Sequence, residues 1–92
     1  MIRSFRHRGL RQFYENDDPS RVAAALRSKV QRVLSGLDAA GSPQALDIPG
    51  YRLHPLKGSL AGFWSVTVSG NWRIVFRFED GDAFDIDLLD YH

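Results

Sequence analysis

The second half of the chain repeats one local pattern, in which alternating residues lead into a tight turn and then alternate again. Residues 63–69, 72–79 and 83–91 each alternate apolar and polar side chains, as strands with one buried face do. Gly70-Asn71 and Asp80-Gly81 separate these stretches, and such pairs tolerate the positive φ that two-residue hairpins require. Because hairpins join neighbouring strands, this half of the sequence predicts an antiparallel meander and limits what the rest of the chain can form.

The alternation also predicts which face of the meander is buried. The large apolar side chains fall on one face, and we expect the inward set to be Trp64, Val66, Val68, Trp72, Ile74, Phe76, Phe78, Phe84, Ile86 and Leu88. Arg73, Val75 and Arg77 point the other way. That second face is therefore expected to be available for a ligand.

The first half carries the signals of helices. A short strand is expected at residues 2–6, and residues 9–15 fit a first short helix. Residues 17–20 (Asp-Asp-Pro-Ser) are typical of a helix start, since acids favour the positive end and Pro fits the first turn. Apolar residues then recur with a period of about 3.6, at Val22, Leu26, Val30, Val33, Leu34 and Leu37. Gly41-Ser42-Pro43 is expected to end this second helix.

Residues 44–50 are expected to be a loop, and residues 51–56 a short strand broken by Pro55. The predicted fold is therefore α+β, with two N-terminal helices packed on one face of a mostly antiparallel sheet of four to five strands. The helices are expected on the face with the aromatic side chains, because those side chains need burial. With 92 residues and no linker or repeat, the chain is expected to be one domain, residues 1–92.

Composition argues against several classes of protein. There are no cysteines, which removes disulfides, thiolate zinc sites and cysteine nucleophiles, and fits a reducing, cytoplasmic location. No apolar stretch approaches the ~20 residues that cross a bilayer, and residues 1–6 lack the apolar core of a signal peptide. A membrane partner is not expected.

The charges are unevenly distributed along the chain. Residues 1–36 hold eight basic and three acidic side chains, whereas residues 79–92 hold six acidic side chains and no Lys or Arg. Ten of the twelve basic residues are arginines, whose forked guanidinium group suits contact with phosphate. A solvated charged surface and a polyanionic partner are both compatible with this asymmetry.

The last three residues, Asp90, Tyr91 and His92, can all share or transfer a proton. They follow the apolar residues of the last predicted strand, so we expect the tail to be anchored to the sheet. Anchoring would give the proton-transfer groups a fixed position. The alternative is local: Asp90 hydrogen-bonds nearby or caps the sheet edge, and His92 is mobile unless it is tied down.

Basic candidates lie on the neighbouring predicted strands. His54 precedes Pro55, and Arg73 and Arg77 share the outward face of the middle strand. Each also has a plain structural interpretation, because a histidine can be hydrogen-bonded in place and a strand arginine can cover apolar surface with its stem. For Arg77 an ion pair with an aspartate of the last strand, residue 85 or 87, is the favoured interpretation.

Two imidazoles, a carboxylate, a phenol and guanidinium groups suit RNA strand cleavage. In that reaction the 2′-hydroxyl is the nucleophile, so the protein supplies a base, an acid for the 5′ leaving oxygen and cations for the phosphorane charge. Zinc is disfavoured, because His54, Asp90 and His92 include no close ligand pair of the His-x₃-His kind. A serine hydrolase is disfavoured, since the serines between residues 59 and 69 lie in no nucleophile-elbow motif.

Four ordered motifs carry a resemblance to a known family. They are Arg52-Leu53-His54-Pro55-Leu56-Lys57-Gly58, Gly62-Phe63-Trp64-Ser65-Val66, Gly70-Asn71-Trp72-Arg73-Ile74-Val75-Phe76 and the closing Asp90-Tyr91-His92. With the N-terminal Ile2-Arg3-Ser4-Phe5 and Gly9-Leu10 they cover almost the whole chain. The sequence resembles the HigB toxins of bacterial toxin–antitoxin systems, which belong to the wider RelE/ParE superfamily.

This resemblance implies a RelE-like fold and a ribosome-dependent, metal-independent endoribonuclease. Such an mRNA interferase enters the decoding site of the 70S ribosome, cuts the mRNA there and inhibits translation. The resemblance also implies no cofactor and a HigA-like helix-turn-helix antitoxin, with operator DNA bound only through that antitoxin. A gyrase-inhibiting toxin of the ParE type and a non-catalytic antitoxin- or operator-binding module are the alternatives.

Carried over residue by residue, the resemblance assigns a catalytic group, His54, Arg73, Asp90, Tyr91 and His92, and a phosphate contact at Lys57. Arg77 is added as a predicted substrate contact. His54 or Asp90 is expected to accept the 2′-hydroxyl proton, and His92 to protonate the leaving oxygen. Arg73 and Lys57 are expected to stabilise the phosphorane, and Tyr91 to orient the base or stack on RNA. These roles require His54 and His92 to converge over one cationic pocket.

Overall fold

The structure is a computed structural model that describes residues 1–91. It contains helices α1 (Arg8–Asn16) and α2 (Arg27–Ala39), then strands β1 (His54–Pro55), β2 (Trp64–Ser69), β3 (Trp72–Glu79) and β4 (Asp82–Asp90). Three short 3-10 helices, η1 (Ala24–Leu26), η2 (Pro43–Leu46) and η3 (Gly58–Leu60), lie in the connections. Two helices and a sheet in this order confirm the predicted α+β class. Among the described residues, no helix has the length and apolar character needed to cross a membrane.

The sheet is the predicted meander. Its four strands lie in the order β1-β2-β3-β4, and each pair of neighbours is antiparallel. Turns at residues 70–71 and 80–81 join the last three strands, as the Gly-Asn and Asp-Gly pairs predicted. Asp80 and Gly81 both have positive φ, 51° and 83°, which is the backbone conformation that matches the twist of a tight hairpin.

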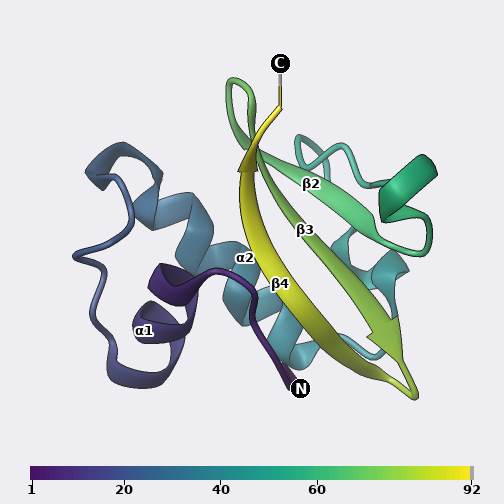
Figure 1. Ribbon diagram of the computed structural model, residues 1–92, viewed down its shortest axis with the longest axis horizontal. Helices are drawn as coiled ribbons and strands as arrows, with labels where there is room; N and C mark the ends of the chain where they lie inside the picture. The colour runs from purple at the N-terminus through teal and green to yellow at the C-terminus, as the bar shows by residue number, and fades with distance from the viewer. Residues whose placement is uncertain (92) are drawn as a thin grey trace.

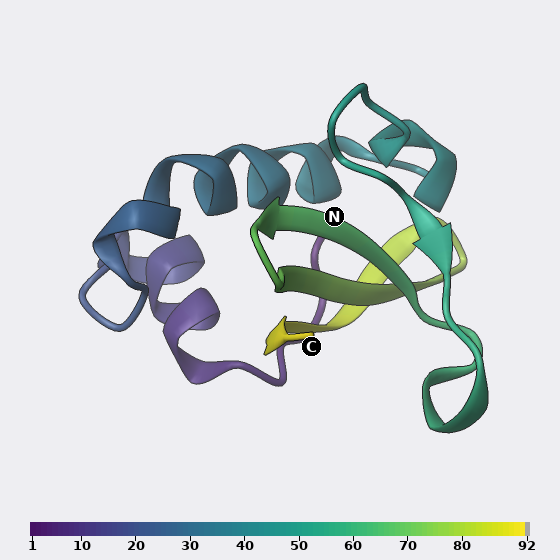
Figure 2. The ribbon, with the colours of Figure 1, turned by 90° about the horizontal axis from the view of Figure 1, so that it is seen from above.

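The apolar side chains of the helices and of the sheet meet in one core. α2 lies across one face of the sheet, and α1 contacts both α2 and β4 (Figure 1, Figure 2). The apolar positions of the helical period and of the strand alternation both contribute side chains to this core. It contains Leu10, Phe13, Val30, Val33, Leu34, Leu37, Val66, Val68, Ile74, Phe76, Ile86 and Leu88.

The second helix begins later than the sequence predicts. Asp17 has a φ of 55° and ends α1, because its backbone N–H donates to Gln12 O. Asp18 then accepts a hydrogen bond from the N–H of Ser20 (3.0 Å), so the two acids build a turn instead of the first turn of a helix. The expected start at residues 17–20 is therefore wrong, and α2 begins at Arg27 after the 3-10 turn η1.

The segment at residues 2–6 was predicted as a strand but makes only two isolated parallel bridges with β4, Ile2 to Ala83 and Phe5 to Ile86. It runs between α1 and β4 (Figure 1). A side chain replaces the regular ladder between the two bridges, because Ser4 Oγ accepts from the backbone N–H of Asp85 (2.9 Å). The segment therefore edges the sheet without becoming a fifth strand.

The expected strand at residues 51–56 is shorter than predicted. Only His54 and Pro55 pair with β2, opposite Ser65 and Trp64 respectively. Arg52 has a φ of 52°, a left-handed conformation that breaks an extended strand just before His54. β1 is thus a two-residue strand that presents one histidine.

A bulge changes which side chains of β4 face the core. The pairing of β3 with β4 shifts between Val75 and Arg77, where Asp85 has a φ of 55°. The extra residue reverses the alternation, so Ala83 enters the core in place of Phe84. Phe84 instead lies beneath the Arg77 guanidinium group, 4.8 Å from its central carbon to the ring centroid. The predicted inward position of Phe84 is therefore wrong.

Two residues of β3 also depart from the expected burial. Trp72, predicted to point inward, is 37% exposed, because it lies at the end of the strand beside the β2–β3 turn. Val75 lies on the face away from α2, yet it is only 1% exposed. The second face of the sheet is thus partly covered by side chains rather than bare.

Candidate functional site

The sheet register places His54 and Arg73 on the same face. His54 pairs with Ser65, and Arg73 pairs with Thr67, two residues further along β2. Directly opposed residues of antiparallel strands point to the same face, and so do residues two apart on one strand. With strands ~4.8 Å apart and a rise of ~3.3 Å per residue, the two Cα atoms are roughly 12 Å apart. Their side chains can therefore reach one phosphodiester group between them.

His54 is held by its backbone neighbours although its side chain is exposed. Nδ1 lies 3.1 Å from the carbonyl oxygen of Arg52. A carbonyl oxygen can only accept, so this contact requires the proton on Nδ1 and leaves the lone pair on Nε2. The hydroxyl of Ser65 lies 3.4 Å from Nε2 and 3.5 Å from Nδ1, which are longer and weaker contacts. This tautomer is the one in which Nε2 can accept a proton.

Arg73 is anchored by the adjacent strand. Its Nη1 donates to Thr67 Oγ1 over 2.6 Å, a short bond of the kind made by charged donors. Its Nε is buried and has no hydrogen-bond partner among the residues that the structure describes. The guanidinium group is therefore fixed at one corner by Thr67.

Arg77, on the same face, is engaged in ion pairs. Its Nε lies 2.8 Å from Asp85 Oδ2, and its Nη1 lies 2.9 Å from Glu79 Oε2. The hydrogen bond from Arg77 is the main reason that the pKa of Asp85 is lowered. The predicted ion pair between Arg77 and Asp85 is confirmed, whereas the carboxylate of Asp87 accepts from the N–H of Leu88. A substrate phosphate would have to compete with two carboxylates for Arg77, whose binding role stays a prediction.

The described end of the chain is tied to the sheet at Tyr91, in line with the predicted anchoring of the tail. The backbone N–H of Tyr91 donates to Asn71 O over 2.7 Å, which holds the end of β4 against the β2–β3 turn (Figure 1). Asp90 pairs with Trp72, whereas Arg73 pairs with Leu89, so Asp90 is one position away from the residue opposite Arg73. Asp90 is exposed. Tyr91 is 37% exposed. His92 lies outside the described residues, and so does its predicted convergence with His54.

Lys57 lies in the connection that follows β1. It is exposed and immediately precedes η3. The hydrogen bond from Leu56 N to Phe63 O (2.8 Å) closes this connection into a loop, so Lys57 stays close to the edge strand that carries His54. Its predicted contact with phosphate remains a prediction.

Sequence reasoning missed Ser65 and Thr67 as partners of the basic residues. Their signal is visible in hindsight: they are the two polar residues between the apolar ones in Trp64-Ser65-Val66-Thr67-Val68. A strand alternation alone assigns them to a face, but it does not reveal that Ser65 is fully buried while it touches an exposed histidine.

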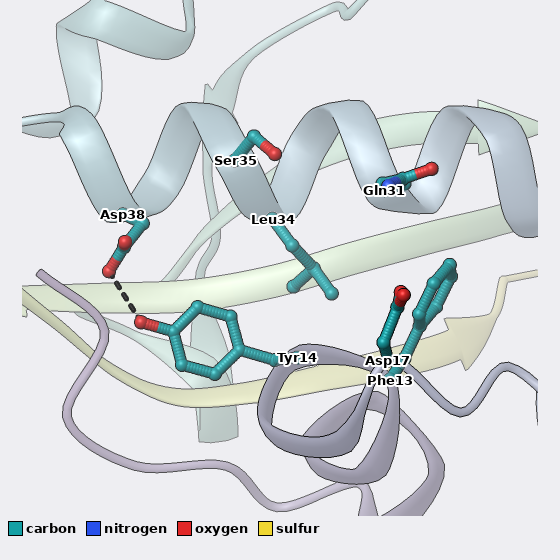
Figure 3. Close-up of a pocket in the computed structure, with 7 residues that line it drawn as sticks. All are labelled: Phe13, Tyr14, Asp17, Gln31, Leu34, Ser35 and Asp38. Carbon is teal, nitrogen blue, oxygen red and sulfur yellow. Dashed lines mark hydrogen bonds between the residues drawn. The ribbon is translucent and has the colours of Figure 1, made fainter.

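A separate cleft of about 300 Å³ lies between α1 and α2. It is lined by Phe13, Tyr14, Asp17, Gln31, Leu34, Ser35 and Asp38, and Tyr14 donates to Asp38 across it (2.7 Å; Figure 3). None of the predicted site residues lies there. Within residues 1–91, no three His, Cys, Asp or Glu side chains are arranged to hold a metal ion.

Comparison with known proteins decides the family. The model of the HigB-like toxins, the RelE-like toxins of the type II toxin–antitoxin system HigB, matches residues 3–92. The chain belongs to this family. The resemblance carried by the sequence motifs is therefore confirmed.

Two HigB relatives match along all or nearly all of their length. An endoribonuclease HigB from Proteus vulgaris is 42% identical over 92 residues, covering 100% of both chains. The toxin HigB-1 of Vibrio cholerae serotype O1 (strain ATCC 39315 / El Tor Inaba N16961) is 36% identical over 94 residues, covering 100% of this chain and 98% of its own.

Solved structures of other toxins share the fold of this HigB-like chain. The toxin in a YoeB–YefM complex from Staphylococcus aureus has a TM-score of 0.62 at 18% identity, over 100% of this chain and 98% of that chain. A YoeB dimer from the same organism has a TM-score of 0.60 at 19% identity, over 99% and 97%. At this level of identity, the likeness concerns the fold alone.

Proposed function

We propose that this HigB-like toxin is a ribosome-dependent endoribonuclease that cuts mRNA in the decoding site and so inhibits translation. The full-length match to a relative named as an endoribonuclease supports the activity. The observation that carries it is the shared face of His54 and Arg73, with a proton acceptor at Nε2 and a guanidinium group anchored beside it.

The reaction divides between groups that the chain supplies. His54 Nε2 takes the proton of the 2′-hydroxyl, and the resulting oxygen forms a bond to phosphorus while the bond to the 5′ oxygen breaks. His92 gives the leaving 5′ oxygen its proton, so the products are a 2′,3′-cyclic phosphate and a 5′-hydroxyl end. Arg73 and Lys57 stabilise the charge of the phosphorane. This step consumes no water, because the 2′-hydroxyl is the nucleophile.

The choice of base follows from the register. His54 shares its face of the sheet with Arg73. Asp90 pairs with Trp72, whose position alternates with that of Arg73 along β3. We therefore assign the base to His54 and an orienting role to Asp90 and Tyr91 at the tethered chain end. An exposed tyrosine can also stack on an unpaired base of the mRNA.

The acidic final segment does not prevent approach to RNA. Asp82 is paired with the N-terminal amine (3.3 Å) and with Arg3 (2.9 Å), and Arg77 pairs with Glu79 and Asp85. Internal ion pairs therefore offset the charge of Asp82 and Asp85, two of the four acidic side chains of β4. The basic side chains on the exposed side of the helices remain available to steer the protein toward an anionic surface.

The partners follow from the family. A type II toxin has a protein antitoxin, and we propose a HigA-like helix-turn-helix protein that binds operator DNA on behalf of both. The YoeB neighbour was solved in complex with YefM, which supports a toxin–antitoxin assembly of this fold. The proposed targets are the ribosome and its mRNA, and they imply a cytoplasmic location.

Primer extension on mRNA that is being translated by purified ribosomes tests the proposal. Wild-type protein is expected to give cuts within codons, and none when ribosomes are omitted. His54→Ala and Arg73→Ala are expected to lower the cleavage rate by about 100-fold or more, the usual worth of a positioned base or charge. Removal of His92 is expected to have a similar effect.

A matched histidine control is available. His7 Nδ1 accepts from the N–H of Leu10 (3.1 Å) and caps α1, so His7→Asn removes an imidazole while it keeps an acceptor for the cap. This variant should cleave at the wild-type rate. Unchanged cleavage by His54→Ala would overturn the assignment of the base. Absence of cuts with wild-type protein, together with inhibition of gyrase supercoiling, would favour the ParE-type alternative.

A further inference from the structure

β2 lies between the two strands that carry the basic groups of the site. It is paired with β1 on one side and with β3 on the other. Its two hydroxyl side chains that face away from α2, Ser65 and Thr67, are the cross-strand partners of His54 and Arg73. Each hydroxyl is therefore adjacent to one group of the proposed active site.

Thr67 holds the guanidinium group of Arg73 at one corner. The bond from Nη1 to Oγ1 is 2.6 Å, shorter than an ordinary N–H···O bond. A threonine on a strand has few side-chain rotamers, so its hydroxyl is an acceptor in a defined position. A fixed corner limits the rotation of the guanidinium plane, which determines where the remaining donors point.

Ser65 contacts His54 from the neighbouring strand β2. It is fully buried (0% exposed), and its hydroxyl has the imidazole nitrogens within 3.4 and 3.5 Å. A buried hydroxyl without a partner is costly, so the contact resists a swing of the ring away from the sheet. With Arg52 O on Nδ1, the exposed ring is contacted on two sides.

We propose that Ser65 and Thr67 are positioning residues for the cleavage reaction: β2 orients the imidazole of His54 and the guanidinium group of Arg73 toward the same phosphodiester. The inference rests on the proposed function and extends it to two residues that act through His54 and Arg73 rather than on the substrate itself. Thr67 acts on the charge that stabilises the phosphorane, and Ser65 acts on the base. A misdirected group of this kind lowers the rate constant of the bound complex more than it weakens binding.

The test for Thr67 compares two substitutions in the cleavage assay on translating ribosomes. Thr67→Val keeps the shape and removes the acceptor, and is expected to lower the single-turnover rate constant by about 10- to 100-fold. Thr67→Ser restores the acceptor and should recover most of the rate. In the Arg73→Ala background, Thr67→Val should cause little further loss, because its effect passes through Arg73.

The test for Ser65 uses a control on the same strand. Ser65→Ala should lower the rate constant by about 10-fold, whereas Ser69→Ala, at the exposed end of β2, should leave it unchanged. Nitrogen-15 NMR of the His54 ring provides a readout that needs no activity. Wild-type protein should show the tautomer with its proton on Nδ1, and Ser65→Ala should show ring signals broadened by exchange between orientations.

The possible outcomes distinguish failure of the inference about Ser65 and Thr67 from failure of the proposed function. If wild-type protein does not cut mRNA on ribosomes, the proposed function fails. If Arg73→Ala and His54→Ala lose cleavage while Thr67→Val and Ser65→Ala cut at the wild-type rate, the function stands and the inference is overturned. If circular dichroism shows that Thr67→Val is unfolded, Thr67→Ala takes its place in the assay. Full activity of Thr67→Ala, or a loss that adds to the loss caused by Arg73→Ala, would overturn the inference equally.

Discussion

Arg77 illustrates how a single side chain on the functional face can serve the fold. Its guanidinium group lies over the ring of Phe84 and pairs with Glu79 and Asp85 at the point where β3 and β4 lose their regular register. The bulge, the left-handed Asp85 and the displaced Phe84 all meet at this arginine. Its role as a stabiliser of the bulge is therefore supported by more contacts than its predicted role in substrate binding.

Replacement of Arg77 by methionine should destabilise the fold while it keeps the apolar stem over Phe84. We expect a lower midpoint of urea unfolding at pH 7, because both ion pairs are lost and the Asp85 carboxylate keeps its burial without its main partner. Arg3→Met removes a pair with a more exposed arginine and should lower the midpoint less. An equal effect of the two substitutions would contradict the special role of the bulge.

The same pair predicts a dependence of stability on pH. Arg77 holds the pKa of Asp85 below its usual value in the folded protein. The pair therefore stabilises the fold at pH values above the unfolded pKa of about 4, and this contribution is lost as the pH falls through the lowered folded pKa. Urea midpoints measured from pH 7 to pH 2 should fall more steeply for wild type than for Arg77→Met, and parallel curves would exclude this contribution.

At the scale of elements, the packing of α1 depends on a close approach at Gly9. A Cβ atom at this position would lie 2.9 Å from Arg21 Cβ and 3.1 Å from Arg21 O. The connection between the two helices therefore runs directly against the first turn of α1. A side chain larger than hydrogen would push the backbone of Arg21 away from α1.

Alanine substitutions at two helical glycines should have opposite effects. Gly9→Ala should cost about 1–3 kcal/mol of unfolding free energy, because the backbone of Arg21 cannot move away freely. Gly36→Ala in α2 meets only the end of the Leu46 side chain at 3.3 Å and should be neutral or stabilising by up to about 1 kcal/mol, since alanine favours a helix. Urea denaturation of both variants measures the contrast, and effects of the same sign would contradict it.

At the scale of the whole molecule, the N-terminal segment ties the helical half to the last strand. Ile2 is 7% exposed and belongs to the core, and its N–H donates to Asp38 of α2 (3.0 Å). The next residue donates its backbone N–H to Ala83 of β4 (2.8 Å). The first residues therefore connect α2 with the strand whose far end carries the proposed catalytic residues.

Ile2→Ala is expected to lower the unfolding free energy by about 2–3 kcal/mol, the range for truncation of a buried isoleucine. An added N-terminal peptide that only displaces the terminal amine from Asp82 should change the unfolding midpoint little, because that pair is exposed. Thermal unfolding of the two proteins measures the difference. A tag that destabilises as strongly as Ile2→Ala would show that the amine contributes as much as the side chain, against this prediction.

Much of the fold and part of the site could be predicted from local patterns. Alternation and two turn signals predicted the meander, and helical periodicity predicted the apolar face of α2, because both depend on residues a few positions apart. The same reasoning placed Arg73 on the face away from the helices and predicted that the tail is anchored to the sheet. The family motifs, whose family is confirmed by a match over residues 3–92, added the predicted set of site residues, which local patterns do not supply.

What only the tertiary structure decided depends on partners far apart in the chain. Ser4 meets Asp85, and this contact at the sheet edge accompanies the bulge that turns Phe84 out of the core. Ser65 and Thr67 acquire meaning only when β1 and β3 bring His54 and Arg73 beside them. The amino-acid sequence by itself determined the periodicities and hence the elements, because backbone geometry converts spacing into faces. Packing decided the strand register, the bulge and the contacts of Ser65 and Thr67 with His54 and Arg73. Each of these features depends on the relative position of two segments that are far apart in the chain.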